Sequence, residues 1–232
     1  MKPPRRALAT CAALAAALFF AARPAWADGV TLTGGTITFE GRIDRGTSAQ
    51  FLQLLQGASV TRLVITSPGG LVDAALDMAD AIHQRGLDVE VPQECLSSCA
   101  NYVFPAARRK TLGWPGAVAW HGNMTHVLYL EQTGQAAWTA EQMADARRLA
   151  RREAAFFERI GVDGFICWFG KIAPYDADAF YYLAPQDMAK FGVRDVTVQD
   201  GASHGADPQG LRMIVVDRDL VDALRPTVRT DD

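Results

Sequence analysis

The sequence has 232 residues, of which 49% are hydrophobic and 21% are charged, an ordinary balance for a globular protein of one domain. Residues 1–27 contain four basic and no acidic residues, so the rest of the chain has 19 basic against 26 acidic residues and a net charge of −7. An acidic surface of this kind argues against nucleic acid or an anionic membrane as a partner.

The first 27 residues have the pattern of a secretory signal peptide. A basic start is followed by an apolar run over residues 7–22 and by an A-x-A site that ends at Ala27. This order is typical of a cleavable export signal, and the run is shorter than the roughly 20 residues that cross a bilayer. We therefore expect a mature chain that starts at Asp28 and that is periplasmic or secreted.

Residues 28–200 alternate between strand and helix patterns. The predicted strands cover residues 30–43, 63–65, 87–91, 117–120 and 196–198, and the predicted helices cover residues 47–55, 71–85, 100–107, 138–160 and 185–191. Strands that alternate with helices predict an α/β domain with crossover connections. Residues 201–232 are rich in turn residues at their start and predict a loosely structured C-terminal extension.

Residues 138–160 form the clearest predicted helix. Thr139 and Gln142 make a capping box at its start. Four arginines lie along it, at positions 147, 148, 151 and 152, and we expect them to form a solvated helix face rather than a binding patch.

Three cysteines remain once residues 1–27 are set aside. Cys95 and Cys99 are four residues apart and could pair if a turn or helix separates them, which an oxidising compartment permits. Cys167 would then stay unpaired. The sequence has no C-x-x-C motif, and nothing in it indicates a bound metal or an organic cofactor.

An S-P-G-G segment at residues 67–70 lies between a predicted strand and a predicted helix. Glycines at such a place allow positive φ angles and a close approach of the backbone to a ligand. Their N–H groups at a helix start can also bind an oxyanion. Alone, however, S-P-G-G is a common turn.

Ser97, Ser98 and His121 are candidates for acyl-transfer chemistry. The two serines lie in the turn before a predicted helix, where the N–H group of the following residue can face a bound oxygen, although serine is also a favoured helix N-cap. His121 closes a predicted strand and could deprotonate a serine if a carboxylate held its other ring nitrogen. His126 is close in sequence and could take its place.

The order of these pieces resembles the proteolytic subunit of the Clp protease. In that family a strand, S-P-G-G and a helix precede a serine that opens the next helix, and a histidine follows after a proline, here Pro115, and a strand. Residues 176–195 (DADAFYYLAPQDMAKFGVRD) resemble the stretch that begins with the family's catalytic aspartate. The resemblance covers roughly residues 30–198 and implies the Clp-protease/crotonase fold, a spiral of β-β-α units with a parallel sheet and flanking helices.

The resemblance also implies a serine hydrolase, in particular a peptidase that acts on peptide or protein substrates. Matched position by position, Ser98 would be the nucleophile, His121 the general base and Asp176 the residue that orients the histidine. The N–H groups of the glycine pair Gly69 and Gly70, and of Cys99, would form the oxyanion hole.

Some points stay open. Cys95 and Cys99 bracket the serines, unlike the small residues usual in the family, so Ser97 rivals Ser98, and Asp178 rivals Asp176. A thiol nucleophile at Cys99 and a binding module without catalysis are the alternatives. The related signal peptide peptidases pair serine with lysine, but none of the mature chain's three lysines lies where such a lysine is expected.

Partners follow from the compartment and from the resemblance. An ATP-driven unfoldase is not expected to act with an exported protein. Relatives assemble into rings or trimers through long helices, so a homo-oligomer is a possibility, although residues 138–160 could equally pack on their own domain.

Overall fold

The computed structural model describes residues 29–57, 59–113, 116–199 and 211–230. The expected signal peptide, the expected mature start at Asp28 and Pro115 lie outside these residues. Among the helices of the described residues, none is long and apolar enough to span a membrane. The chain forms an α/β protein with two mostly parallel mixed sheets flanked by helices.

The larger sheet has six strands in the order β1-β2-β3-β4-β6-β9. A hairpin of β1 and β2 is antiparallel, and the remaining strands add in parallel. The strands are β1 (Gly29–Thr33), β2 (Thr36–Glu40), β3 (Arg62–Thr66), β4 (Asp88–Val91), β6 (Lys110–Leu112) and β9 (Val196–Val198). Alternate residues such as Ile37, Phe39 and Leu63 are fully buried, as expected where helices cover a sheet.

The smaller sheet has four strands in the order β10-β8-β7-β5. They are β5 (Glu94–Leu96), β7 (Ala117–Trp120), β8 (Tyr181–Tyr182) and β10 (Arg212–Met213). Ser67, just after β3, joins the two sheets, because its N–H group donates to Glu94 O and its carbonyl accepts from Leu96 N–H. The S-P-G-G loop is thereby held beside the end of β5.

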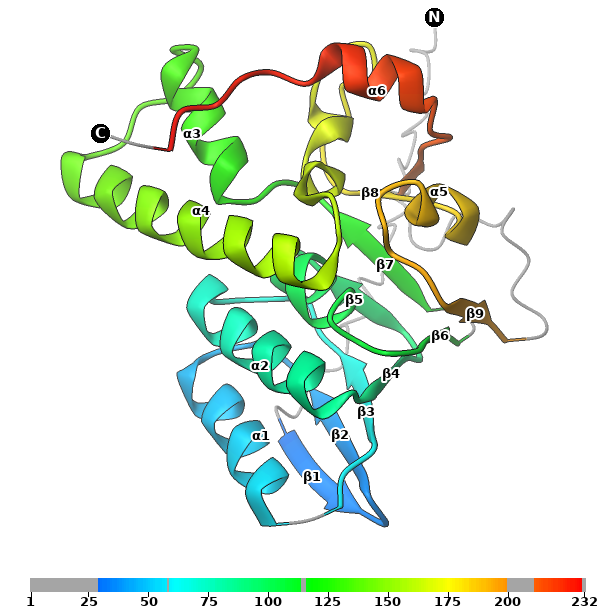
Figure 1. Cartoon of the computed structure of the whole chain (residues 1–232). Coiled ribbons are helices and arrows are strands. Elements are labelled where there is room, and N and C mark those ends of the chain that lie inside the picture. The colour runs from blue at the N-terminus through cyan, green and yellow to red at the C-terminus, as the bar shows by residue number, and fades with distance from the viewer. Residues whose placement is uncertain (1–28, 58, 114–115, 200–210, 231–232) are drawn as a thin grey trace, which may run out of the picture.

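Helices cover the sheets and carry the long connections (Figure 1). They are α1 (Arg45–Gly57), α2 (Val72–Arg85), α3 (Met124–Gln132), α4 (Ala140–Ile160), α5 (Pro185–Ala189) and α6 (Arg218–Leu224). Shorter helical segments are the π-helical η1 (Cys99–Val103) and the 3₁₀ segments η2 (Gly164–Cys167) and η3 (Phe169–Lys171).

Local sequence signals account for several helix ends. Both hydrogen bonds of the predicted capping box between Thr139 and Gln142 are present at the start of α4. Gly86 ends α2 in the left-handed conformation, which glycine adopts readily at a helix C-terminus. Helix α3 has no counterpart among the predicted elements, although Asn123 caps it by accepting a hydrogen bond from His126 N–H.

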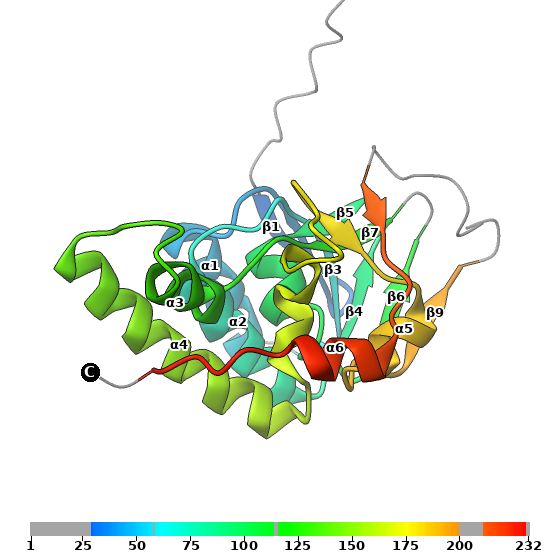
Figure 2. The ribbon, with the colours of Figure 1, turned by 90° about the horizontal axis from the view of Figure 1, so that it is seen from above.

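The C-terminal residues differ from the expectation of a loosely structured extension. Over 211–230 the chain pairs β10 with β8, forms α6 and buries Ile214, Val216 and Val221. The segment after α6 then runs along α4 (Figure 2). It is held there because Arg151 of α4 donates to Thr230 O.

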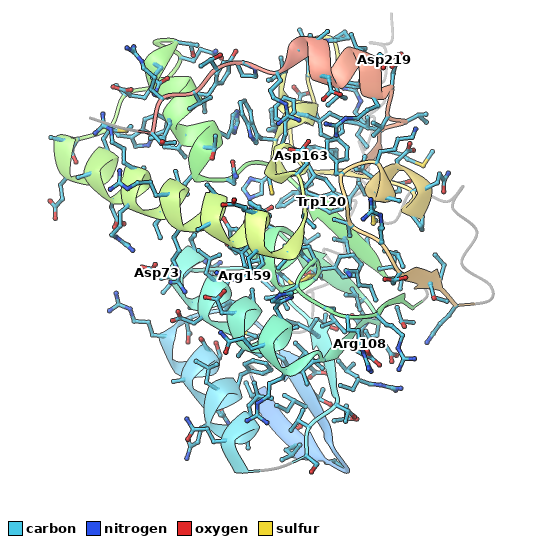
Figure 3. All side chains as sticks on the ribbon, viewed as in Figure 1. Asp73, Arg108, Trp120, Arg159, Asp163 and Asp219 are labelled. Carbon is cyan, nitrogen blue, oxygen red and sulfur yellow. A yellow bond between two sulfur atoms is a disulfide. The ribbon has the colours of Figure 1, made fainter. Side chains whose placement is uncertain are left out.

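The arginines of α4 lie on a partly exposed face, as expected, and two of the four also bind the neighbouring helix. Arg152 contacts Asp77 at 2.6 Å and Asp80 at 3.4 Å, and Arg148 contacts Asp73 at 2.9 Å, so both residues join α4 to α2. Arg159 extends this seam by pairing with Asp80. Asp73 and Arg159 mark the two helices of the seam in Figure 3. Arg148, Arg152 and Arg159 therefore contribute to packing between α4 and α2.

Replacement of Arg152 by alanine should lower the free energy of unfolding by about 1–2 kcal/mol, because exposed pairs contribute up to about 1 kcal/mol each and Arg152 serves several carboxylates. Urea denaturation at low salt measures the effect, which should shrink at about 1 M salt. Arg45→Ala is the matched control, since Arg45 is exposed and has no ion pair with any described residue. Equal effects of the two changes would contradict the role of the seam.

Candidate active site

Strand pairing brings Ser97 and His121 together. Strands β5 and β7 are parallel with Leu96 opposite Ala119, and Ser97 N–H donates to Ala119 O at 3.2 Å. Ser97 directly follows β5 and His121 directly follows β7. Because parallel strands end at the same sheet edge, these two side chains emerge side by side.

The Ser97 hydroxyl and the His121 imidazole form a hydrogen bond. Ser97 Oγ lies 2.7 Å from His121 Nε2, within the range that a general base needs to take a proton from a nucleophile. Ser97 has a φ of +53°, a left-handed conformation that is uncommon for a residue other than glycine. Such strain is often found where a turn presents a reactive side chain.

Ser98 lies elsewhere in the same turn. Its hydroxyl donates to Gly70 O at 2.8 Å, and the residue is only 3% exposed. The structure therefore does not bring Ser98, the serine favoured by the resemblance, to His121. Ser98 instead ties the turn to the S-P-G-G loop, and the geometry favours Ser97 as the nucleophile.

The S-P-G-G loop packs tightly on this turn. A Cβ atom on Gly69 would lie 2.5 Å from Leu96 O and 2.8 Å from Ser97 Cβ, so only glycine fits there. The Gly69 N–H group donates to Ser67 Oγ at 3.1 Å and is thus already engaged. Of the expected oxyanion donors, Gly70 lies beside Ser98. With Ser97 as nucleophile, the following N–H group is that of Ser98 rather than that of Cys99.

A disulfide closes the turn. Cys95 in β5 and Cys99 at the start of η1 are bonded, with Cα atoms 5.2 Å apart, and both residues are fully buried. The pairing considered from their spacing is therefore present, and Cys167 is a free, buried cysteine. A bonded sulfur cannot act as a thiolate, so the structure does not support Cys99 as a nucleophile.

The surroundings of His121 favour a neutral imidazole. Burial lowers the pKa of His121 below its usual 6.5, and the positive charge of Lys171 lowers it further. The ring packs against Phe180 with ring centres 4.4 Å apart. A neutral imidazole can accept the proton of Ser97, so His121 is in the form that a base requires at neutral pH.

His126 is a second imidazole at the same place. Burial lowers its pKa to about 4, with further contributions from Lys171 and His121. Its ring stacks on Trp168 at 5.4 Å between ring centres, and its Nδ1 lies beside Gly122. No contact between His126 and either serine is among the hydrogen bonds of the described residues, so the structure brings His121 rather than His126 to Ser97.

The structure does not bring Asp176 or Asp178 to His121. Both residues are exposed, and neither side chain hydrogen-bonds the imidazole within the described part of the chain. Lys171 accounts for this, because its Nζ donates to the carbonyls of Ala177, Asp178 and Ala179 at 2.6, 3.0 and 2.8 Å. The loop thus turns its backbone toward the lysine and places Phe180, not a carboxylate, against His121.

A cavity of about 400 Å³ opens next to the Ser97–His121 pair. Gly70 and Gly122 line it near the reactive groups. Its lining is mixed, with the apolar side chains of Val72, Met124, Val127 and Leu130 beside the polar Asn101, Tyr102, Asn123 and His126. This arrangement could hold an acyl group or an apolar side chain with its reactive carbon near Ser97.

Four buried polar residues near the cavity were not among the sequence candidates. They are Asn101 and Tyr102 of η1, Asn123 at the start of α3 and Glu153 of α4. A signal for Glu153 exists in the sequence, because it interrupts the apolar stripe of α4 at Met143, Ala146, Ala150 and Phe157. A carboxylate on the buried face of a helix requires buried partners.

No protein-family model matches the chain, and no match is found among curated proteins. Among the described residues, no group of three or more histidine, cysteine, aspartate or glutamate side chains could hold a metal ion.

Removal of the charge of Lys171 should raise the pKa of both imidazoles. Lys171→Gln keeps an N–H donor for the loop carbonyls but removes the positive charge that disfavours imidazolium. NMR titration of histidine ring signals should give higher midpoints for His121 and His126 than in the wild type. Lys190→Gln is the control, since this lysine binds Asp187 and Val216 O instead. Unchanged midpoints in Lys171→Gln would refute this electrostatic account.

Proposed function

We propose that the chain is an exported serine hydrolase in which Ser97 is the nucleophile and His121 is the general base. The observation that carries this proposal is the 2.7 Å contact between Ser97 Oγ and His121 Nε2 at the mouth of a cavity. A strained serine next to a neutral imidazole is the arrangement expected of an activated hydroxyl.

The proposed fold is that of the Clp-protease/crotonase superfamily. Two features support it, namely the unit of strand, S-P-G-G loop and helix, and the second unit in which β5 leads into the serine turn and η1. The link through Ser67 places the two units beside one another, as an oxyanion loop and a nucleophile turn require. Residues 30–198, to which the resemblance extends, contain all of these parts.

The proposed reaction is acyl transfer through Ser97. His121 takes the hydroxyl proton as Ser97 Oγ bonds to the carbonyl carbon, and then gives this proton to the leaving group. Water hydrolyses the acyl-enzyme with the same base. The N–H groups of Gly70 and Ser98 are the proposed oxyanion donors, each worth about 3–4 kcal/mol in such sites.

Peptides or proteins with apolar side chains are the proposed substrates, because four apolar side chains contribute to the lining of the cavity. A periplasmic location is supported by the disulfide at Cys95 and Cys99, since disulfides persist in oxidising compartments.

Labelling by a fluorophosphonate should require Ser97 and His121. We expect Ser97→Ala and His121→Ala to reduce labelling at least about 100-fold, because each removes one half of the activated pair. Ser98→Ala is the comparison variant, since its hydroxyl binds Gly70 O rather than His121 and its loss should lower labelling far less than the loss of the Ser97 hydroxyl. Abolished labelling in Ser98→Ala, with retained labelling in Ser97→Ala, would contradict the assignment.

The same labelling assay tests whether an aspartate orients His121. If no carboxylate orients His121, Asp176→Asn and Asp178→Asn should change the labelling rate by less than about threefold, whereas loss of a triad aspartate lowers rates by roughly 10⁴-fold. A large loss in either variant would show that this aspartate reaches His121 in the working enzyme.

A binding module without catalysis is the second candidate function. It is favoured by the exposed positions of Asp176 and Asp178, which leave His121 without a carboxylate partner in the described structure. A folded wild-type protein that resists labelling would support this alternative.

A further inference from the structure

A buried carboxyl group lies behind the catalytic pair. Glu153 of α4 is only 1% exposed. Its Oε1 accepts hydrogen bonds from the Tyr102 hydroxyl and from Met124 N–H, the latter at 3.2 Å, and Thr125 N–H also contributes. Its Oε2 has no partner among the described residues. Burial of a carboxyl group costs free energy unless it is hydrogen-bonded, so the partners of Glu153 show which segments it connects.

These partners belong to the two segments that carry the reactive residues. Tyr102 is in η1, the helical segment that follows the Ser97 turn, and Met124 is the first residue of α3, three positions after His121. A second link joins the same segments, because Asn101 Nδ2 donates to Gly122 O at 2.9 Å. The turn that leads out of His121 is therefore held from η1 and from α4.

The charge of Glu153 matters to these links. As a carboxylate it accepts charge-assisted bonds from the first N–H groups of α3, which are stronger than bonds to a neutral acid. The titratable groups that face it are Tyr102 from η1 and Cys167 from η2, and burial raises the pKa of both, so they stay neutral. From α3 it meets backbone N–H groups.

We propose that Glu153 is a positioning residue whose ionised carboxylate orders the turn from His121 to Met124 and thereby aligns His121 with Ser97. This inference rests on the proposed function of the Ser97–His121 pair. The hydrogen bond from the Tyr102 hydroxyl to Glu153 also holds η1, the segment that follows Ser97.

The proposal predicts that the labelling rate depends on the ionisation of two groups, Glu153 and His121. Burial raises the pKa of Glu153 to about 7, so the carboxylate forms as the pH rises through neutrality. His121 loses its proton at lower pH, since its pKa is below 6.5. The labelling rate should therefore rise in two steps, first as His121 becomes neutral and then as Glu153 ionises.

Stability should change in the opposite direction. In the unfolded chain Glu153 ionises near its ordinary pKa of 4.5, whereas in the folded protein it ionises at about 7. Between these values the folded state holds more protons, so this group makes the protein less stable as the pH rises. The melting temperature of the wild type should therefore fall, relative to Glu153→Gln, between about pH 5 and about pH 8.

The experiment measures fluorophosphonate labelling rates from about pH 5 to about pH 9. Glu153→Gln should lose the step near neutral pH, keep the step of His121 and reach a plateau about 10-fold lower, because a displaced base slows the reaction. Tyr102→Phe should keep both steps, since the carboxyl group remains. Glu158→Gln, an exposed change on the same helix, is the matched control and should behave as the wild type.

A second measurement does not depend on catalysis. In Ser97→Ala protein with labelled histidines, the NMR signal of His121 should show an additional inflection near neutral pH that is absent when Glu153→Gln is added. If the wild type is not labelled but this inflection is present, the proposed function fails, whereas the effect of Glu153 ionisation on His121 is supported. If the wild type is labelled and neither measurement shows the neutral step, the role of Glu153 is refuted. If Glu153→Gln fails to fold, the Ser97→Ala protein alone still tests the proposal, because the absence of the inflection from its His121 signal would refute the role of Glu153.

Discussion

The parallel pairing of β5 with β7 is the constraint on which the candidate site depends. Its register places Leu96 opposite Ala119, and the residues that follow the two strands are Ser97 and His121. His121 lies two positions beyond Ala119, so a slip of one residue would move it along the sheet edge relative to Ser97 and change the distance between the two side chains. Ser67 links this sheet to the larger one, so the S-P-G-G loop lies beside Ser97 and His121.

The left-handed conformation of Ser97 has to be maintained by its neighbours, because such a conformation costs about 1–3 kcal/mol. Three contacts oppose its relaxation, namely the disulfide across the turn, the bond from Ser98 to Gly70 O and the close approach of Gly69. The disulfide closes a loop with only three residues between its cysteines, which restricts the conformations open to Ser97. Ser98 and Cys99, which the sequence offered as catalytic candidates, thus stabilise the conformation of Ser97 in this structure.

The sequence predicted most of the elements but not which side chains meet. Gly86, the capping box and the apolar strands are local signals, and the structure has the expected elements at each of them. Adjacent serines carry the same chemistry, and only the backbone conformation of Ser97 distinguishes them. The position of the 176–178 segment is set by Lys171 and three carbonyl groups, which no side-chain pattern encodes. The C-terminal packing rests on a few isolated apolar residues, too few to give a periodic signal.

The setting of His121 also limits the kind of acyl group that the proposed pair can attack. In a triad the carboxylate stabilises the imidazolium that forms when the serine loses its proton. Here the charged group that acts on His121 is Lys171, which disfavours that cation. Attack on an amide needs the imidazolium to persist until it protonates a poor leaving group, whereas esters and phosphonates release their leaving groups with less help. On these grounds cleavage of the proposed peptide substrates calls for an added negative charge near His121, whereas activated acyl groups are attacked without one.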